Sequence, residues 1–150
     1  MKNLYDSGVG ADIDGRLANL RADSQRQWGK MNLAQALAHC SGGMEFAVGD
    51  VNPPRMLIGR LVGWAVKRKT VAGDAPLEKN TPTAKGLVIE DQRDLERERA
   101  RLRGLLNRFV AAGPSGCTKH PHSFFGDLTP EEWSTLMYKH LDHHLRQFGA

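Results

Sequence analysis

Residues 91–113, DQRDLERERARLRGLLNRFVAAG, carry the clearest helical pattern in the chain. Large apolar residues recur at helical spacing along one side of the segment, and charged residues fill the other side. The apolar positions are Leu95, Leu102, Leu105, Leu106 and Phe109. Asp91 is the expected N-terminal cap and Gly113 the expected stop. The pattern predicts an amphipathic helix whose apolar side faces a core and whose charged side faces solvent.

A second helix is expected between residues 32 and 49. Asn32 can cap it, and Gln35 follows three residues later, as in a capping box. Gly42 and Gly43 lower the helix propensity in its middle. The usual reason for such glycines is that another element comes close, so we expect a close approach here.

Two further helices are less sharply marked. One is expected to begin near Asp12 or Asp14 and to stop near Ser24. The other covers RMLIGRLVGWAVKRK, residues 55–69, and its basic end suits a helix C-terminus. The three tryptophans of the chain, Trp28, Trp64 and Trp133, are assigned to the core rather than to a substrate site.

The last helix has the best-defined start. Thr129 can cap it, Pro130 stands in the first turn, and Glu132 is at the capping-box position. Between the helices, residues 70–90 show no sustained period, and GLVIE at 86–90 is the one candidate strand. The sequence therefore predicts one all-α domain over residues 1–150, an antiparallel four-helix bundle with long inter-helix loops and one short extra helix.

The composition argues against several classes of protein. The chain has 21 Lys and Arg interleaved with 17 Asp and Glu, for a net charge of +4, so nucleic acid is not expected as a partner. The start lacks an apolar signal region, and the most apolar stretch is short and broken by Arg60. A soluble, cytoplasmic protein without membrane contact is expected. Cys40 and Cys117 form no CxxC pair, which predicts inert thiols.

The histidines carry the chemistry of the sequence. His140 and His144 lie one turn apart on the last helix, about 40° from each other, and can share one ion. His143 lies about 60° to the other side and is the weaker candidate. A durable site needs a third ligand. His39 is well placed to supply it, because it lies on an apolar face of the second helix beside two glycines, Gly42 and Gly43.

Plainer interpretations remain open for each histidine. His39 alone is typical of a hydrogen-bonded core or boundary residue, and a terminal HxxHH is often an exposed polar face. His120 and His122 stand in the loop before the last helix. They are candidates for acid or base catalysis at the mouth of a site, and equally for loop histidines that bind only solvent or backbone.

Two segments of the chain resemble one known family. WGKMNLAQALAHCSGGMEFAVGD and the later FGDLTPEEWSTLMYKHLDHHLRQFG are similar to the DinB-like, or YfiT-like, superfamily of metal-dependent enzymes, in its small uncharacterised branch. That superfamily is a four-helix bundle with a histidine on its second helix and an HxxxH on its last. The resemblance implies metal ligation by His39, His140 and His144, with Gln147 at the family's trailing glutamine.

The resemblance also implies expectations about function. The ion would be zinc, nickel, iron or manganese, with a low-molecular-weight thiol as a possible co-substrate. The first expectation is a thiol-dependent S-transferase that acts on a small electrophile, and the second is a metal-dependent hydrolase of a small molecule. A third is a non-catalytic binding bundle in which the metal pins two helices, with His120, His122 or His143 as fourth ligand. Gln35 and Gln147 could orient ligand imidazoles or cap backbone groups, Glu45 is left out of the site, and a homodimer is possible.

Overall fold

The computed structural model describes residues 2–73 and 75–150. Over these residues it contains five α-helices, two short 3-10 helices and no β-strand. The α-helices are α1 (Val9–Asn19), α2 (Leu33–Val48), α3 (Leu57–Val71), α4 (Leu95–Ala112) and α5 (Pro130–Gln147), and the 3-10 helices are η1 (Lys85–Leu87) and η2 (Pro114–Gly116). The predicted all-α class is confirmed. The candidate strand at 86–90 is wrong, because η1 takes up its first part.

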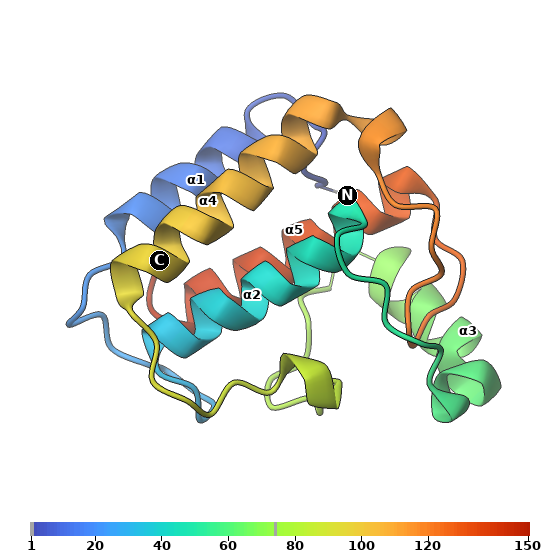
Figure 1. Cartoon of the computed structure of the whole chain (residues 1–150), viewed down its shortest axis with the longest axis horizontal. Coiled ribbons are helices and arrows are strands. Elements are labelled where there is room, and N and C mark those ends of the chain that lie inside the picture. The colour runs from blue at the N-terminus through green and yellow to red at the C-terminus, as the bar shows by residue number, and fades with distance from the viewer. Residues whose placement is uncertain (1, 74) are drawn as a thin grey trace.

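Four of the helices surround one core. α2 packs against α4 and α5, and α1 packs against the same two helices, while α3 lies to one side and contacts α5 (Figure 1). The core is built from apolar side chains of all four inner helices, among them Ile13, Leu17, Leu37, Met44, Leu102, Leu106, Phe109, Trp133, Leu141 and Leu145. The finer description as an antiparallel four-helix bundle stays a prediction.

The helix starts follow capping chemistry. Both predicted capping boxes form, one between Asn32 and Gln35 and one between Thr129 and Glu132. α4 begins later than expected, because the carboxylate of Asp94 accepts the N–H of Arg97 at 2.7 Å and caps the helix. The assignment of Asp91 as the cap is therefore wrong. Asp91 lies outside α4, and its carboxylate pairs with an arginine in the segment before the helix.

The first helix differs most from its sequence pattern. α1 has no side-chain cap, since it starts after Gly8, and it ends at Asn19 rather than near Ser24. Arg99 of α4 explains the early end, because its buried guanidinium donates to the carbonyls of Leu17 and Leu20. These bonds satisfy backbone acceptors that a longer α1 would have used internally.

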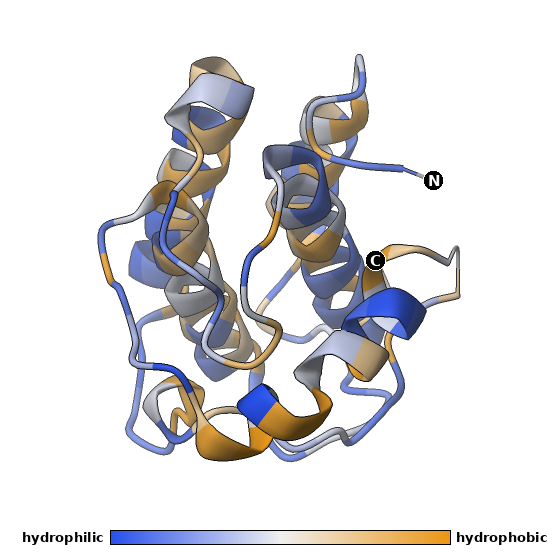
Figure 2. Cartoon of the chain, turned by 90° about the vertical axis from the view of Figure 1, so that its right-hand side faces the viewer, coloured by the Kyte–Doolittle hydropathy of each residue, from blue (hydrophilic) through white to orange (hydrophobic). Residues whose placement is uncertain are grey.

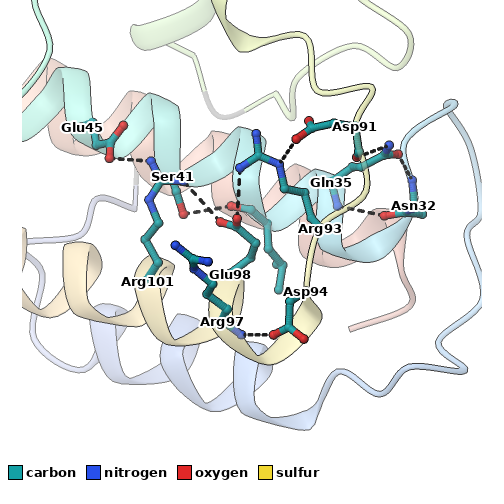
Figure 3. Close-up of polar contacts among 11 residues, drawn as sticks. Asn32, Gln35, Ser41, Glu45, Asp91, Arg93, Asp94, Arg97, Glu98 and Arg101 are labelled. Carbon is teal, nitrogen blue, oxygen red and sulfur yellow. Dashed lines mark hydrogen bonds and ion pairs between the residues drawn. The ribbon is translucent and has the colours of Figure 1, made fainter.

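A buried carboxylate ties α4 to its surroundings. Glu98 accepts hydrogen bonds from Arg93 at 3.2 Å and from Arg101 at 3.3 Å (Figure 3). Arg101 also donates to Glu45 of α2 at 2.6 Å. Glu45 therefore belongs to a structural ion-pair network, in agreement with its omission from the site. Pairing of this kind is what makes a buried charge tolerable.

The tryptophans and cysteines divide between core and surface. Trp133 is buried in the core, Trp28 is half-buried, and Trp64 is 66% exposed, so the assignment of Trp64 to the core is wrong. The reason is that α3 turns the side with Gly59 toward the protein. Both cysteines are buried and free, as predicted. None of the helices formed by residues 2–73 and 75–150 is long and apolar enough to cross a membrane.

Candidate metal centre

Three histidines from two helices meet in the interior. His39 comes from α2, and His140 and His144 come from α5. The ring centroids form a nearly equilateral triangle, with sides of 4.8, 4.8 and 5.0 Å. The rings stand at 70° to 80° to one another, so that edges rather than faces converge. One nitrogen from each ring lies within 4.8 Å of the others.

The glycines of α2 make room for this cluster. A Cβ atom at Gly43 would stand 3.0 Å from Cε1 and Nδ1 of His140, and one at Gly42 would stand 2.6 Å from Cδ2 of Leu87. The expected close approach is thus found, and it has two parts. The imidazole of His140 comes in over Gly43, and the loop before α4 comes in over Gly42.

The orientation of His39 is fixed by the loop between α3 and α4. Its Nδ1 lies 2.8 Å from the carbonyl oxygen of Leu87. Because a carbonyl only accepts, Nδ1 carries the hydrogen and the neutral ring presents the lone pair of Nε2 to the cluster. A hydrogen bond from the second nitrogen is the usual support of a metal-binding histidine.

His144 has a matching support on α5 itself. Its Nδ1 lies 2.7 Å from Oε1 of Gln147, and Nε2 of Gln147 donates to the carbonyl of Trp28 at 2.7 Å. The bond to Trp28 settles which end of the amide faces the ring, so Nδ1 of His144 is the donor. His144 therefore also presents Nε2 as a lone pair.

His140 completes the cluster from the middle. Its Nε2 is 2.8 Å from Nε2 of His39. Since His39 presents a lone pair there, the ion-free pair is stable with a hydrogen on Nε2 of His140. Ligation by His140 through the same nitrogen requires the other tautomer, with the hydrogen on Nδ1. Among the three rings, His140 is thus the one whose hydrogen must move when an ion binds.

Burial keeps these rings neutral. It lowers the pKa of His39 below its ordinary value, although the hydrogen bond to Leu87 opposes the change. It lowers the pKa of His140 strongly, and the neighbouring histidines add to the effect. The pKa of His144 falls to about 3, first through burial and then through His39. Neutral imidazole is the form that binds metal, so the cluster is ready for an ion at neutral pH.

The donor set fits a divalent transition metal. Metal–nitrogen bonds of about 2.1 Å at tetrahedral angles place ligand nitrogens about 3.4 Å apart. The closest pair of nitrogens, 2.8 Å apart, must open by about 0.6 Å, and the widest pair, within 4.8 Å, must close by at most about 1.4 Å to reach that separation. Small side-chain rotations are enough for such changes. The three close histidines could therefore bind a metal ion.

His143 serves a different purpose. Its Nε2 accepts a hydrogen bond from Nε1 of Trp28 at 3.3 Å, and its ring also bonds to the backbone of Leu77. The ring of His143 thereby contacts two separate loops. His143 ties these loops to α5, which agrees with its ranking as the weaker ligand candidate.

The two loop histidines also have local partners. His120 is exposed, and its Nε2 lies 3.3 Å from the carbonyl of Pro53. His122 accepts at Nδ1 from the N–H groups of Phe124 and Phe125, at 3.1 and 3.2 Å. Burial and the nearby Arg55 lower the pKa of His122 to about 4. Both rings shape the turn before α5, and neither belongs to the three-histidine cluster.

The two candidate glutamines have different hydrogen-bond partners. Gln147 supports His144, whereas Gln35 closes the capping box of α2 and donates to the carbonyl of Asp91 at 3.1 Å. The sequence did not point to the carbonyls of Leu87 and Trp28. Backbone acceptors in loops leave no residue-type signal, so only the folded chain reveals them.

The fold and cluster together define an all-α protein in which three histidines lie close enough to bind a metal ion. The chain belongs to the family described as "Protein of unknown function (DUF1569)", whose match covers residues 10–150. That range contains every residue of the cluster and its supports. No curated protein and no solved structure matches the chain.

Proposed function

We propose that the protein binds one divalent metal ion through His39, His140 and His144 and is a metal-dependent enzyme. The observation that carries the proposal is the convergence of three neutral imidazoles, two of which are held by carbonyl acceptors on their outer nitrogens. Structural histidines have no need of such convergence, while metal ligands require it. Zinc, nickel, iron and manganese are the candidate ions.

We further propose that the reaction is a thiol-dependent S-transfer to a small electrophile. The resemblance to the DinB-like superfamily supports this class. A divalent ion held by three neutral ligands keeps its full charge, so it favours an anionic fourth ligand such as a thiolate and would activate it as a nucleophile. The expected partners are a small-molecule substrate and a low-molecular-weight thiol, not nucleic acid, and the protein could act as a homodimer.

The chain's own groups have definite tasks in this proposal. Leu87 and Gln147 hold the rings of His39 and His144 in place, which limits the reorganisation needed for binding. Met137 and Trp133 are buried on the same side of α5 and keep bulk water from that flank.

Two alternatives share the same centre. A metal-dependent hydrolase would use the fourth position for hydroxide in place of a thiolate. A structural role would need a closed shell of four protein ligands. The bonds of His143 to Trp28 and Leu77, and of His122 to Phe124, would have to break for either ring to become that ligand. This favours an open position and therefore an enzyme.

Metal analysis and thiol conjugation test the proposal in two stages. The purified protein should hold one ion per chain, and His39→Ala, His140→Ala or His144→Ala should each abolish that stoichiometry in elemental analysis. The protein loaded with each candidate ion should then conjugate a chlorinated aromatic or an epoxide to a cellular thiol. If all three variants keep the ion, the proposed metal centre is wrong. If no combination of thiol and metal gives conjugation, the proposed S-transfer is wrong, while the proposed metal centre is unaffected.

A further inference from the structure

The outward side of α3 is the most apolar surface of the described chain. Leu57 is 79% exposed, Ile58 52%, Leu61 72% and Trp64 66%. Of the nine large hydrophobic residues found exposed, only Val88 lies outside the stretch from Val51 to Val66. Figure 2 shows this helix at the lower front, where much of its ribbon is orange. Exposed apolar patches of this kind mark interaction sites.

The same segment accounts for the net positive charge of the protein. Residues 51–73 contain five Lys and Arg and no Asp or Glu. Since the whole chain has a net charge of +4, the remainder carries a net charge of −1. The interleaving of charges seen along the sequence therefore stops at this helix. Arg60 and Lys69 flank the apolar side of α3, and Arg68 stands near its C-terminal end.

The helix is fixed so that this side faces outward. A Cβ atom at Gly59 or Gly63 would come within 2.4 and 2.2 Å of the carbonyl oxygen of Phe124, so the inner side of α3 rests directly on backbone. Lys67 forms an ion pair with Glu132 at 2.8 Å, and Lys139 donates to the carbonyl of Thr70 at 2.7 Å. These contacts hold α3 in place, so its apolar side faces away from the rest of the protein.

Against the expectation from the sequence that the protein has no membrane contact, we propose that α3 docks the protein on an anionic lipid surface. A helix with aliphatic residues and tryptophan on its outer side, flanked by basic residues, has the features of an interfacial helix. Leu57, Leu61 and Trp64 would enter the region between headgroups and acyl chains. Arg60 and Arg68 would meet lipid phosphates, to which each basic residue adds attraction, while Lys69 already pairs with Glu78 at 2.6 Å.

Charge complementarity favours lipid over the other occupants. In a two-fold dimer through α3, Arg60 and Arg68 of one copy would face the same basic helix of the other; α3 contains no acid, and the carboxylate of Glu78 is already paired with Lys69. Nucleic acid would match the charge but leave the aliphatic side chains uncovered. An anionic bilayer covers both kinds of group at once.

Vesicle co-sedimentation tests this docking with the full-length protein. Vesicles of phosphatidylcholine with about 30% phosphatidylserine should bind the protein, pure phosphatidylcholine should bind it at least about tenfold more weakly, and added salt should release it. Insertion should shift tryptophan fluorescence to the blue, and Trp64→Phe should remove that shift. Equal sedimentation with both kinds of vesicle, or with neither, would overturn the proposal.

Matched variants separate the apolar and the charged contributions. Leu57→Gln with Leu61→Gln should reduce binding at least about tenfold, whereas Val88→Gln, an exposed apolar residue elsewhere, should not. Arg60→Glu with Arg68→Glu should do the same, while Arg97→Glu with Lys119→Glu changes the net charge equally and should leave most binding intact. Circular dichroism checks that each variant is folded. Light scattering that finds a dimer dissolved by Leu61→Gln, without lipid binding, would assign α3 to a second copy and overturn the proposal.

Discussion

The carbonyl of Leu87 accepts a hydrogen bond of 2.8 Å from Nδ1 of His39, while the side chain of Leu87 lies over Gly42. One loop residue thus contacts α2 twice, through its backbone and through its side chain. The backbone contact orients an imidazole of the three-histidine centre, and the side-chain contact fills the space above a glycine. The long loop between α3 and α4 is therefore part of the candidate metal centre.

Replacing the two glutamines should have different consequences. Gln147→Ala removes the acceptor of His144 Nδ1 and should weaken metal binding by about 10-fold to 100-fold. Gln35→Ala removes part of the capping box of α2 and should cost about 1 kcal/mol of unfolding free energy while metal affinity stays within about twofold. Competition with a chromogenic chelator measures the first effect, and urea unfolding of the metal-free protein measures the second. Equal metal affinities in the two variants would contradict the assigned roles.

Alanine substitutions at Gly42 and Gly43 should have different effects on metal affinity. At Gly43 the new methyl group stands 3.0 Å from His140, and the ring must move to make room, so metal affinity should fall about tenfold. At Gly42 the new methyl meets only the end of the flexible Leu87 side chain, so affinity should change less than about twofold. Alanine raises helix propensity in both variants by about 1 kcal/mol. The same chelator competition distinguishes them, and a larger loss at Gly42 would contradict the geometry.

His143→Ala tests the difference between a ligand and a loop anchor. The variant loses the hydrogen bonds to Trp28 and Leu77, which should lower the unfolding free energy by about 1 to 2 kcal/mol. The loop around Leu77 should become more sensitive to proteolysis. Metal content should remain one ion per chain, as in the wild type, when measured by elemental analysis. Loss of the ion in this variant would instead make His143 a ligand.

The sequence predicts helices well where local chemistry is sufficient. The capping boxes at Asn32 and Thr129 are completed within three residues, so the sequence contains all that is needed to place both helix starts. The end of α1 depends on Arg99, which lies about 80 residues away along the chain and therefore leaves no local trace. Asp91 lies outside α4, where its carbonyl accepts a hydrogen bond from Gln35 of α2 and its carboxylate pairs with Arg93.

The candidate site shows the same division. The spacing of His140 and His144 on one helix predicts that they lie together, and Gly43 indicates the approach that brings His140 onto α2. The supporting carbonyls of Leu87 and Trp28 come from loops without periodicity, which sequence reasoning cannot place. The assignment of Trp64 to the core failed for another reason. The many apolar residues of α3 predict a helix. They do not show that the side with the glycines faces the protein and that the side with Trp64 faces outward.

The metal-free protein should lose stability as the pH falls below about 6.5. Burial lowers the pKa of His122 from 6.5 to about 4. Between these values the unfolded state binds a proton that the folded state does not, so the unfolding free energy decreases as the pH decreases. At pH 5 the loss of unfolding free energy due to His122 is about 2 kcal/mol, and the depressed pKa values of the buried cluster histidines act in the same direction.

Urea unfolding in the presence of a chelator, at about pH 7.5 and pH 5, measures the difference. His122→Gln keeps an acceptor for the N–H of Phe124 but does not titrate, so its loss between the two pH values should be smaller than that of the wild type by about 2 kcal/mol. Identical losses in both proteins would show that His122 is already solvated in the folded state.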